Sequence, residues 1–483
     1  MKKALFILIL ICIMLAACAN GDTGSADTTA VDTVQGNGVA ETTEEIVKDD
    51  LPAFDFDGIE FNIWVNDSTW LNNDIDTLET NGDILNDAIF ERNAVVEERF
   101  NVVINSSVTL GRGNNDPKSS ILAGDCDYKF VLQTDRVVLT YAQEGLIYSI
   151  DDLPYIDVSK PYWSQSINKE ISIHNKLYFS YGDFNLSSYD YTHVLTFNKK
   201  LVEDYSLDNL YDLVKSGKWT YDKFNTMMQA VTNDINGDGV MNKEDQYGIL
   251  SQAKHVLPCL WISAGELSIK KNADDEPEFN LSTDAKFANI IETIFNMTWD
   301  TGSWFANTES NNADLTQNTM FENNQGLFGN STFFYIGALR SMEADFGIIP
   351  YPKYDEVQEN YYSRVEGGRA SGVPITVTDT DMVSVIMEAM SATSYELVIP
   401  AYYEIALKGK VSRDAESEEM LDIIMNGRIY DLGDTYWCDQ LRDGIFEPMF
   451  KANNRDFVSK MEAAKPRLDE AIAKAIAAFE AIG

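Results

Sequence analysis

Histidine and cysteine are scarce in this chain of 483 residues, which contains 3 His and 5 Cys. So few of these ligands argue against a transition-metal enzyme rich in histidine and against a scaffold held by disulfides. Positive charge is scarce as well, because 37 Lys and Arg face 77 Asp and Glu, and the formal net charge is −40. Nucleic acid is bound by clustered Lys and Arg, so we expect no nucleic-acid partner.

Several enzyme motifs are also missing from the sequence. There is no G-x-S-x-G, H-E-x-x-H, P-loop or C-x-x-C. His174, His193 and His255 do not cluster along the chain, so we expect each of them to be structural. We therefore predict that the protein is not an enzyme. A glycoside hydrolase stays an alternative, because 77 acidic residues make carboxylate pairs by chance.

The overall composition is that of a folded globular chain. Hydrophobic residues make up 45% and charged residues 24%, which excludes wholesale disorder. Because a domain takes roughly 100–200 residues, the length predicts two or three domains or two large lobes.

The N-terminus has the pattern of an export signal. Two lysines precede an apolar run at residues 4–14, which is shorter than the ~20 residues that a spanning helix needs. The run ends in Leu-Ala-Ala-Cys18, which resembles the lipobox of bacterial lipoproteins. That resemblance implies that residues 1–17 are a signal peptide and that Cys18 carries the lipid. A plain secretory signal with an incidental cysteine is the alternative.

Residues 18–50 are rich in Thr, Gly and acidic side chains and have almost no large apolar ones. Such a segment buries too little surface to offset its ordering entropy, so we predict a lipid anchor followed by a disordered acidic tether. No later segment of the sequence looks long and apolar enough to cross a bilayer. We therefore expect the protein to lie outside the cytoplasm and to be attached to the cell membrane by its lipid only. Three further cysteines, Cys126, Cys259 and Cys438, lie far apart in the sequence. We expect them to be buried free thiols, and a single disulfide between two of them is the alternative.

The folded part shows strands and helices in alternation. Apolar residues alternate from Ile59 to Val65, recur at helical spacing from Leu85 to Phe100, and form short runs at 102–104 and 128–132. Strand, helix and strand at this spacing predict a parallel sheet with helical crossovers. Later segments predict strands at 193–197 and 346–349, helices within 380–410 and 414–427, and a C-terminal amphipathic helix that Pro466 kinks or breaks.

The sharpest chemical motif is a twelve-residue loop of the EF-hand type. It fits D-x-[DN]-x-[DN]-G with a carboxylate at position twelve, and Gly239 supplies the turn at position six. Alternate oxygens of such a loop converge on one Ca²⁺ ion. A single loop argues against a calcium sensor, so we predict a structural Ca²⁺ held by Asp234, Asn236, Asp238, the carbonyl of Val240, Asn242 and Asp245. A turn that binds nothing is the alternative.

Polar and aromatic residues at the ends of predicted strands are candidate ligand contacts. Ligands of open α/β sheets bind where strands end and polar loops begin. Aromatic faces stack on sugars while polar side chains bond hydroxyl groups, so both types together suit a carbohydrate. For each residue, core packing or a solvated loop is the alternative. The candidates are Trp70, Thr134, Asp135, Arg136, Phe334, Tyr335, Arg369, Tyr436 and Trp437.

By its motifs the chain resembles the extracellular solute-binding lipoproteins of bacterial ABC importers, close to their carbohydrate-binding, family 1-like branch. The resemblance spans essentially the whole mature chain. It rests on the order and spacing of DAIFERNAVVEERFNV, DYKFVLQTDRVVLTYAQEGLIYSIDDLPYIDVSKPYW, NKLYFSYGDFNL, VLTFNKKLVEDYSLDNLYDLVKSGKWTYDKF, DFGIIPYPKYD and SYELVIPAYYEIALKGKVSRDAESEEMLDII, and on the calcium-type loop ahead of DQYGI.

The resemblance implies a fold, a division of the chain and a function. The expected fold is the two-lobe α/β fold of periplasmic binding proteins of type 2, with a hinge and a central cleft. Lobe 1 is expected at 51–192 plus 350–410, and lobe 2 at 193–349 plus 411–483. The expected function is to capture a carbohydrate, an oligosaccharide, in the cleft and to deliver it to the permease subunits. The protein is expected to be a monomer that closes on its ligand by a hinge motion.

Three alternatives stay open at this point. An anchored glycoside hydrolase predicts two carboxyl groups facing each other across the cleft. A peptide or other non-sugar ligand is compatible with the same fold. A surface adhesion or scaffold module is suggested by the loop, which resembles that of a dockerin, but the lack of a second such loop counts against it.

Overall fold

The protein is described by a computed structural model, which covers residues 47–67, 74–110, 117–125, 127–306, 316–405 and 415–482. Cys18 and the predicted signal peptide lie outside the described residues, as do nearly all of the predicted tether, Trp70 and Cys126.

The first sheet has four strands in the order β11-β3-β1-β2. Strand β1 (Ile59–Asp67) pairs in parallel with β2 (Val102–Leu110) along its whole length and with β3 (Phe130–Thr134) on its other side. Helix α1 (Ile84–Phe100) makes the crossover from β1 to β2. The predicted parallel sheet with helical crossovers is therefore confirmed. Strand β11 (Arg369–Gly372) closes one edge and runs antiparallel to β3.

The second sheet also has four strands, in the order β5-β8-β4-β9. Strands β4 (His193–Asn198) and β8 (Gly326–Thr332) run antiparallel at its centre, with β5 (Tyr247–Leu250) and β9 (Phe346–Ile349) at the edges. Every residue of β4, β5 and β9 is buried. Because both faces are covered, the two edge strands β5 and β9 show no alternation of polar and apolar residues in the sequence.

The chain passes between the two sheets more than once, and the passing segments lie side by side. One passage follows α5 (Ser187–Asp190), where Thr192 forms a β-bridge with Val365. Next to it, β10 (Ser363–Arg364) pairs in parallel with β12 (Arg428–Ile429). All strands of the first sheet fall within 51–192 and 350–410, and all those of the second fall within 193–349.

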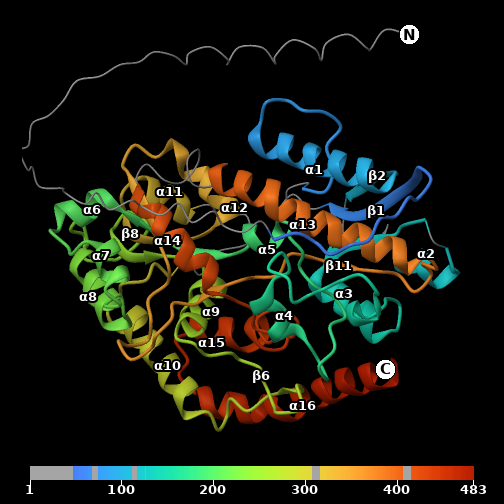
Figure 1. The fold of residues 1–483 in the computed structure, drawn as a ribbon. Helices are drawn as coiled ribbons and strands as arrows, with labels where there is room; N and C mark the ends of the chain where they lie inside the picture. The colour runs from blue at the N-terminus through green and yellow to red at the C-terminus, as the bar shows by residue number, and fades with distance from the viewer. Residues whose placement is uncertain are drawn as a thin grey trace, which may run out of the picture. The chain divides into compact units, whose positions relative to one another are not determined.

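Helices cover both sheets, as Figure 1 shows. Helix α13 (Thr380–Glu404) packs on α1 beside the first sheet, and α14 (Ala415–Asn426) contacts β9 of the second. By length and composition α13 is apolar enough to span a membrane, which corrects the expectation that no later segment is. Since 78% of its most apolar window is buried inside the protein, α13 is explained as a core helix.

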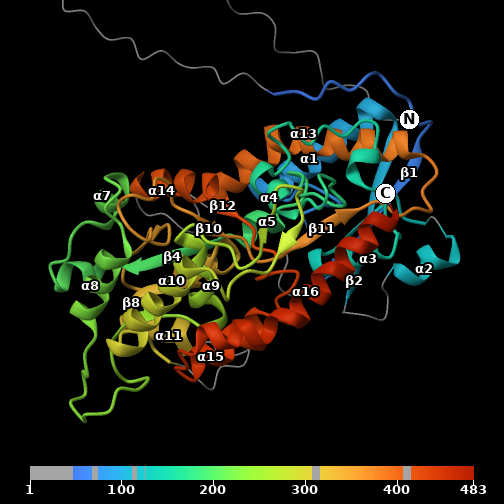
Figure 2. The same ribbon diagram turned by 90° about the horizontal axis from the view of Figure 1, so that it is seen from below.

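The C-terminal helix α16 (Phe457–Ile482) continues through Pro466, so of the two predicted effects of this proline the break is wrong, while the kink stays a prediction. One face of α16 is buried from Met461 to Phe479, and this packing outweighs the missing hydrogen bond. The helix contacts α10 (Ala285–Phe295) beside the second sheet and α3 (Asp135–Gln143) beside the first. Figure 2 shows it running from α15 (Glu447–Lys451) towards α3.

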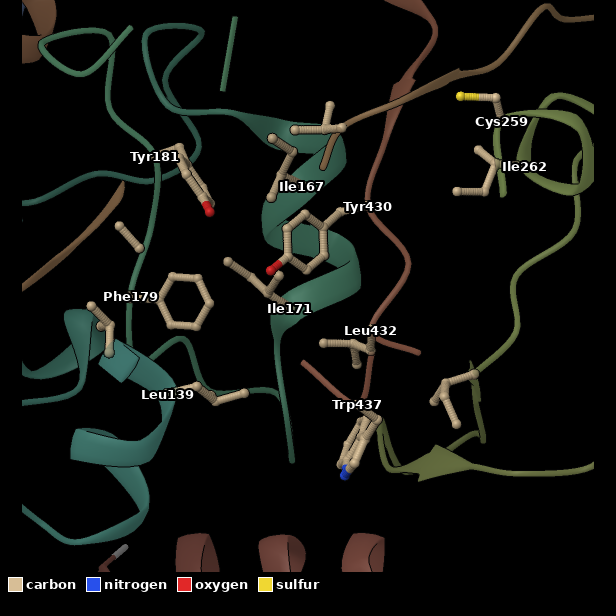
Figure 3. Close-up of a cluster of buried hydrophobic side chains, with 14 of the residues drawn as sticks. Leu139, Ile167, Ile171, Phe179, Tyr181, Cys259, Ile262, Tyr430, Leu432 and Trp437 are labelled. Carbon is tan, nitrogen blue, oxygen red and sulfur yellow. The ribbon is translucent and has the colours of Figure 1, made fainter. Parts of the chain in front are cut away.

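A hydrophobic core connects the regions around both sheets. Figure 3 shows Leu139 and Ile167, from the first sheet's side, in one cluster with Ile262 of α9 (Ala253–Ser263). Tyr430 lies between them, on the segment that follows β12. The thiols of Cys259 and Cys438 are free and buried, as expected for the two of these cysteines that the structure describes.

Candidate functional site between the two sheets

A cavity of about 540 Å³ lies where elements of both sheets meet. Its wall on the first sheet's side comes from the end of β3, the start of α3 and the loop before β11. Its wall on the second sheet's side comes from the start of α9 and the end of β8. The lining residues are Thr134, Asp135, Arg136, Tyr191, His193, Ser251, Gln252, Lys254, His255, Gln317, Asn318, Asn330, Ser331, Thr332, Tyr335, Glu366, Gly367, Gly368, Asp434, Thr435, Cys438 and Arg442.

On the first sheet's side, Asp135 is fixed by its neighbours. The hydroxyl of Tyr430 donates to its Oδ2, and the Arg136 N–H donates to its Oδ1. Burial raises the pKa of Asp135 above its ordinary value. Gly368 has a φ of 131°, and a Cβ there would lie 2.8 Å from Ser187 Oγ, so only glycine lets this loop line the cavity.

On the second sheet's side, uncharged polar groups predominate. Asn330, Ser331 and Thr332 end β8, and Ser251 and Gln252 precede α9. The hydroxyl of Thr332 is buried and has no hydrogen-bond partner in the described part of the chain. Amides and hydroxyls of this kind suit a ligand that carries hydroxyl groups.

Three aromatic rings stand together beside these polar groups. The ring of Phe334, on α12 (Phe333–Ile336), stacks on Tyr191, with centroids 6.3 Å apart and planes at 18°. Its other neighbour is Tyr335, which meets it edge-on at 5.0 Å and 85°. Tyr335 is 36% exposed and lines the cavity. The arrangement gives the cavity an aromatic surface supported from behind by Phe334.

Charged side chains form a paired network at one end of the cavity. Arg364 donates to both carboxylate oxygens of Asp434. Glu366 lies 3.2 Å from Arg364 Nη1 and 2.9 Å from Arg442 Nη1. Burial opposes the charge of Glu366, but Arg364 and Arg442 outweigh it and hold the pKa of Glu366 well below its ordinary value. The network is therefore charged and internally compensated.

Two of the histidines belong to this network, which corrects the expectation that they do not cluster. The ring centroids of His193 and His255 are 5.4 Å apart. His193 Nε2 and His255 Nδ1 lie 3.1 and 3.2 Å from Glu366 Oε2. Burial lowers the pKa of His255 to about 4, so this ring is neutral at pH 7.

Two histidines and a carboxylate within 4.8 Å of one another are a ligand set that suits a metal ion. Here Arg364 Nη1 lies 3.0 Å from His193 Nε2, 3.3 Å from His255 Nδ1 and 3.2 Å from Glu366 Oε2. The guanidinium thus stands where the three ligand atoms converge. It brings the positive charge that a metal ion would bring, so these residues do not fit a metal.

Cys438, Asp439 and Asp443 form a second group of ligand atoms within 4.8 Å of one another. Burial raises the pKa of the Cys438 thiol to about 12, so the thiolate that binds metals is disfavoured. Arg136 Nη1 lies 2.9 Å from the sulfur and 3.3 Å from Asp439 Oδ1. This group is therefore explained by its arginine contacts.

The structure brings some of the predicted ligand contacts together and separates others. Thr134, Asp135, Arg136 and Tyr335 line the cavity, and Phe334 supports Tyr335 from behind. Apart from Phe334, three described residues of the prediction are not among the cavity's lining residues, namely Arg369, Tyr436 and Trp437.

Each of these three has another environment. Arg369 is 2% exposed, and its Nη2 lies 3.3 Å from Asp74 Oδ1. Trp437 is 3% exposed and lies in the hydrophobic cluster of Figure 3, with Tyr436 partly buried against it. Trp70 lies outside the described residues.

The residues missed by sequence reasoning are those of β8, the start of α9 and the charged network. The end of β8, Asn330 to Thr332, could have been recognised from the sequence, because a strand that ends in Asn-Ser-Thr places hydrogen-bonding side chains at the end of a sheet. The network could not have been recognised, since its members come from distant segments.

The predicted calcium loop lies between α8 (Tyr221–Val231) and β5. Asp234 accepts the N–H groups of Gly237 and Gly239, each at 2.7 Å. Asp245 is buried and accepts those of Ile235 and Asn242. The carboxylates of the loop are not among the described groups whose ligand atoms lie within 4.8 Å of one another, and the binding of Ca²⁺ to this loop stays a prediction.

Comparisons with known proteins find likeness in structure only. No family model matches the sequence, and no curated protein matches it. The sugar-binding protein MalE from Xanthomonas citri is similar with a TM-score of 0.61 and 12% identity, over 88% of this chain and 100% of that one. The ABC substrate-binding protein Lmo0181 from Listeria monocytogenes, in complex with cycloalternan, gives a TM-score of 0.56 and 11% identity, over 86% and 100%.

A family 1 extracellular solute-binding protein from Bifidobacterium longum subsp. infantis gives a TM-score of 0.56 and 12% identity, over 86% of this chain and 99% of that one. At such identities the likeness defines the fold. The chain has the two-lobe α/β fold of the carbohydrate-type solute-binding proteins, which confirms the predicted fold class and, at the level of the fold, the predicted resemblance.

Proposed function

We propose that the protein is the extracytoplasmic solute-binding component of an ABC importer, and that it binds an oligosaccharide in the cavity between its two sheets. The observation that carries the proposal is the cavity itself. Both sheets contribute to its wall, and its lining combines an exposed aromatic ring with amides and hydroxyls. The solved proteins of the same fold are described as sugar-binding or solute-binding proteins.

The charges of the lining favour an uncharged ligand over a peptide. Three basic residues, Arg136, Lys254 and Arg442, stand against three acidic ones, Asp135, Glu366 and Asp434. The acidic residues already have partners within the protein. The cavity wall therefore has no excess of positive or negative charge that would attract the charged terminus of a peptide.

The same pairing favours binding over hydrolysis. A glycoside hydrolase needs one carboxylic acid and one free carboxylate on either side of the scissile bond. Glu366 and Asp434 are held by arginines, and Asp135 accepts two hydrogen bonds from Tyr430 and Arg136. Glu366 and Asp434 are therefore not free carboxylates that could attack a sugar, which supports the proposal that the protein binds its ligand without turnover.

Calorimetric titration of the purified chain tests this function. We expect saturable binding of a neutral oligosaccharide from a panel that contains maltotriose and cycloalternan, no binding of a tripeptide, and recovery of the sugar unchanged. Binding of the tripeptide alone, or release of smaller sugars during incubation, overturns the proposal. Binding is also expected to raise the Tm, because the ligand stabilises the folded state by mass action.

We further propose that Cys18 carries a lipid, that the anchored protein hands its ligand to permease subunits as a monomer, and that the loop at 234–245 binds a structural Ca²⁺. The anchor is supported by the lipobox-like sequence. It is tested by expressing the full chain and its Cys18→Ala variant in a bacterium. We expect the first in the membrane fraction with the mass of a lipid added, and the second outside that fraction.

A further inference from the structure

Asn330, near the end of β8, is one of the residues that line the cavity on the second sheet's side. Three groups converge on its Oδ1. The Tyr351 hydroxyl lies at 2.6 Å, His193 Nδ1 at 3.2 Å and the Cys259 sulfur at 3.6 Å. All three of these side chains are about 1% exposed. The oxygen of the amide is thus directed into the protein and away from the cavity that Asn330 lines.

The contacts of His193 determine which way the amide points. Arg364 Nη1 lies 3.0 Å from His193 Nε2, and an arginine can only donate. If the ring is neutral, Nε2 accepts from Arg364 and the proton is on Nδ1. If the ring is charged, both nitrogens carry protons and Nε2 donates to Glu366, 3.1 Å away. In both of these states Nδ1–H donates to Asn330, and the atom facing it is the oxygen. A neutral ring with its proton on Nε2 would instead donate to Glu366 and accept the amide N–H at Nδ1, so the inference requires that Nδ1 carries a proton.

The amide nitrogen of Asn330 is then the atom left for the cavity. Turning the amide over would place its N–H₂ group against the N–H of His193 and would cost the bonds to Oδ1. No described residue accepts a hydrogen bond from Nδ2, and Nδ2 is not among the buried atoms that lack a partner. The cavity therefore contains a donor whose direction is fixed before any ligand arrives.

We propose that Asn330 is a specificity-determining residue that donates Nδ2–H to an oxygen of an uncharged, hydroxyl-bearing ligand, and that His193 and Tyr351 position it. The inference rests on the proposed function and goes beyond it by naming the donor group that selects the ligand. A donor without charge suits a hydroxyl or ether oxygen, and the balanced charges around it give no advantage to an anionic ligand.

The Asn330→Asp variant tests the donor, because it keeps an oxygen for Tyr351 and His193 and removes the N–H group. We expect its Kd for whichever of maltotriose and cycloalternan binds the wild type to rise at least about tenfold, the effect of about one good hydrogen bond. Thr196→Val is the matched control. Thr196 lies on the neighbouring strand β4, where its hydroxyl donates to the Gly329 carbonyl at 2.9 Å, and it is not one of the residues that line the cavity. The Kd of the Thr196→Val variant for the same saccharide should therefore equal that of the wild type.

A measurement without ligand keeps the inference separate from the proposed function. In the wild-type protein labelled with ¹⁵N-histidine, we expect the NMR signal of His193 Nδ1 to show a directly bonded proton. An unprotonated Nδ1 overturns the orientation of Asn330 and leaves sugar binding untouched. The Tyr351→Phe variant should split or broaden the ¹⁵N side-chain amide signal of Asn330, which a purely structural tyrosine would not do.

The outcomes separate cleanly. If the wild type binds one of the two saccharides and Asn330→Asp binds it equally well, the donor role is wrong while the proposed function stands. If the wild type binds neither saccharide, the oligosaccharide proposal fails and the role of Asn330 fails with it. A tenfold loss in Asn330→Asp, none in Thr196→Val and a protonated Nδ1 together support the inference.

Discussion

Arg364 donates from Nε and Nη2 to the two carboxylate oxygens of Asp434, over 2.5 and 3.0 Å, and neither side chain has any exposed surface. The two residues come from separate segments that pass between the sheets, one from β10 and one from the segment after β12. The pair therefore ties these segments together at the wall of the cavity.

Removing the carboxylate should leave a buried guanidinium without its main partner. We expect Asp434→Asn to lower the free energy of unfolding by about 3–5 kcal/mol, the usual cost of breaking a buried ion pair from one side. Urea denaturation followed by circular dichroism measures the change.

A surface pair is the matched control for this variant. Lys200 and Asp204 lie 2.5 Å apart, with side chains 53% and 45% exposed. Asp204→Asn should change the stability by less than about 0.5 kcal/mol, because solvent screens the pair. Equal effects of the two substitutions would show that burial does not determine the strength of the Arg364–Asp434 pair.

The pattern of apolar residues was sufficient to predict β1, β2, β3, β4, β9 and the parallel sheet with helical crossovers, whereas the two-lobe fold was expected from the resemblance to solute-binding proteins. Alternation from Ile59 to Val65 identifies β1, and the buried run from His193 to Phe197 identifies β4, because burial of a sheet face leaves a local imprint on the sequence. Pro466 does not break α16, as one half of the prediction had it, since tertiary packing of a long apolar face overrides the local preference.

The charged network has no such imprint. Arg364 and Asp434 are 70 residues apart, and His193 and Glu366 are 173 apart. Only the pairing of distant segments brings them together. The same holds for Trp437, which was a candidate ligand contact because it lies in an irregular stretch late in the chain, while its ring is part of the core. A polar or aromatic residue can be assigned to a site only when it is known which distant segments of the chain lie next to each other in the fold.

Asp183 gives the protein a pH-dependent stability. Its Oδ1 accepts from the Tyr189 hydroxyl at 2.7 Å, while Oδ2 is buried and has no partner among the described residues. Burial raises the pKa of Asp183 to about 7, against a smaller opposing effect of Tyr189 and Arg428. A raised pKa means that stability is fully present below the unfolded pKa of about 4 and is lost as the pH rises through 7.

The Asp183→Asn variant has no proton to lose, so its stability relative to the wild type should increase between pH 4 and pH 8. A shift of about three pKa units corresponds to an increase of at most about 4 kcal/mol. Urea denaturation at several pH values measures it, with the exposed Asp127→Asn as the control. A difference that does not vary with pH would show that Asp183 is not protonated in the folded protein.

Calcium should stabilise the folded chain if the loop binds it. At an ion concentration about 100 times its Kd, the expected gain is about 2.7 kcal/mol, visible as a rise in Tm that a chelator reverses. The rise should vanish in the Asp234→Ala/Asp238→Ala double variant, because these residues supply two of the expected carboxylates. Glu244→Ala is the control, since this exposed residue of the same loop is not one of the predicted ligands. A rise that persists in the double variant places the ion elsewhere.

Tyr335 offers the cavity its exposed aromatic face, and stacking on a sugar ring contributes on the order of 1 kcal/mol or more. We therefore expect Tyr335→Ala to raise the Kd for the bound oligosaccharide by about tenfold and Tyr335→Phe to change it little, as measured by titration calorimetry. Tyr395 on α13 is equally exposed, at 37%, and is not among the lining residues. Tyr395→Ala thus controls for the loss of an exposed ring. If Tyr335→Phe weakens binding as much as Tyr335→Ala does, the ligand uses the hydroxyl group and the aromatic face makes no contribution of its own.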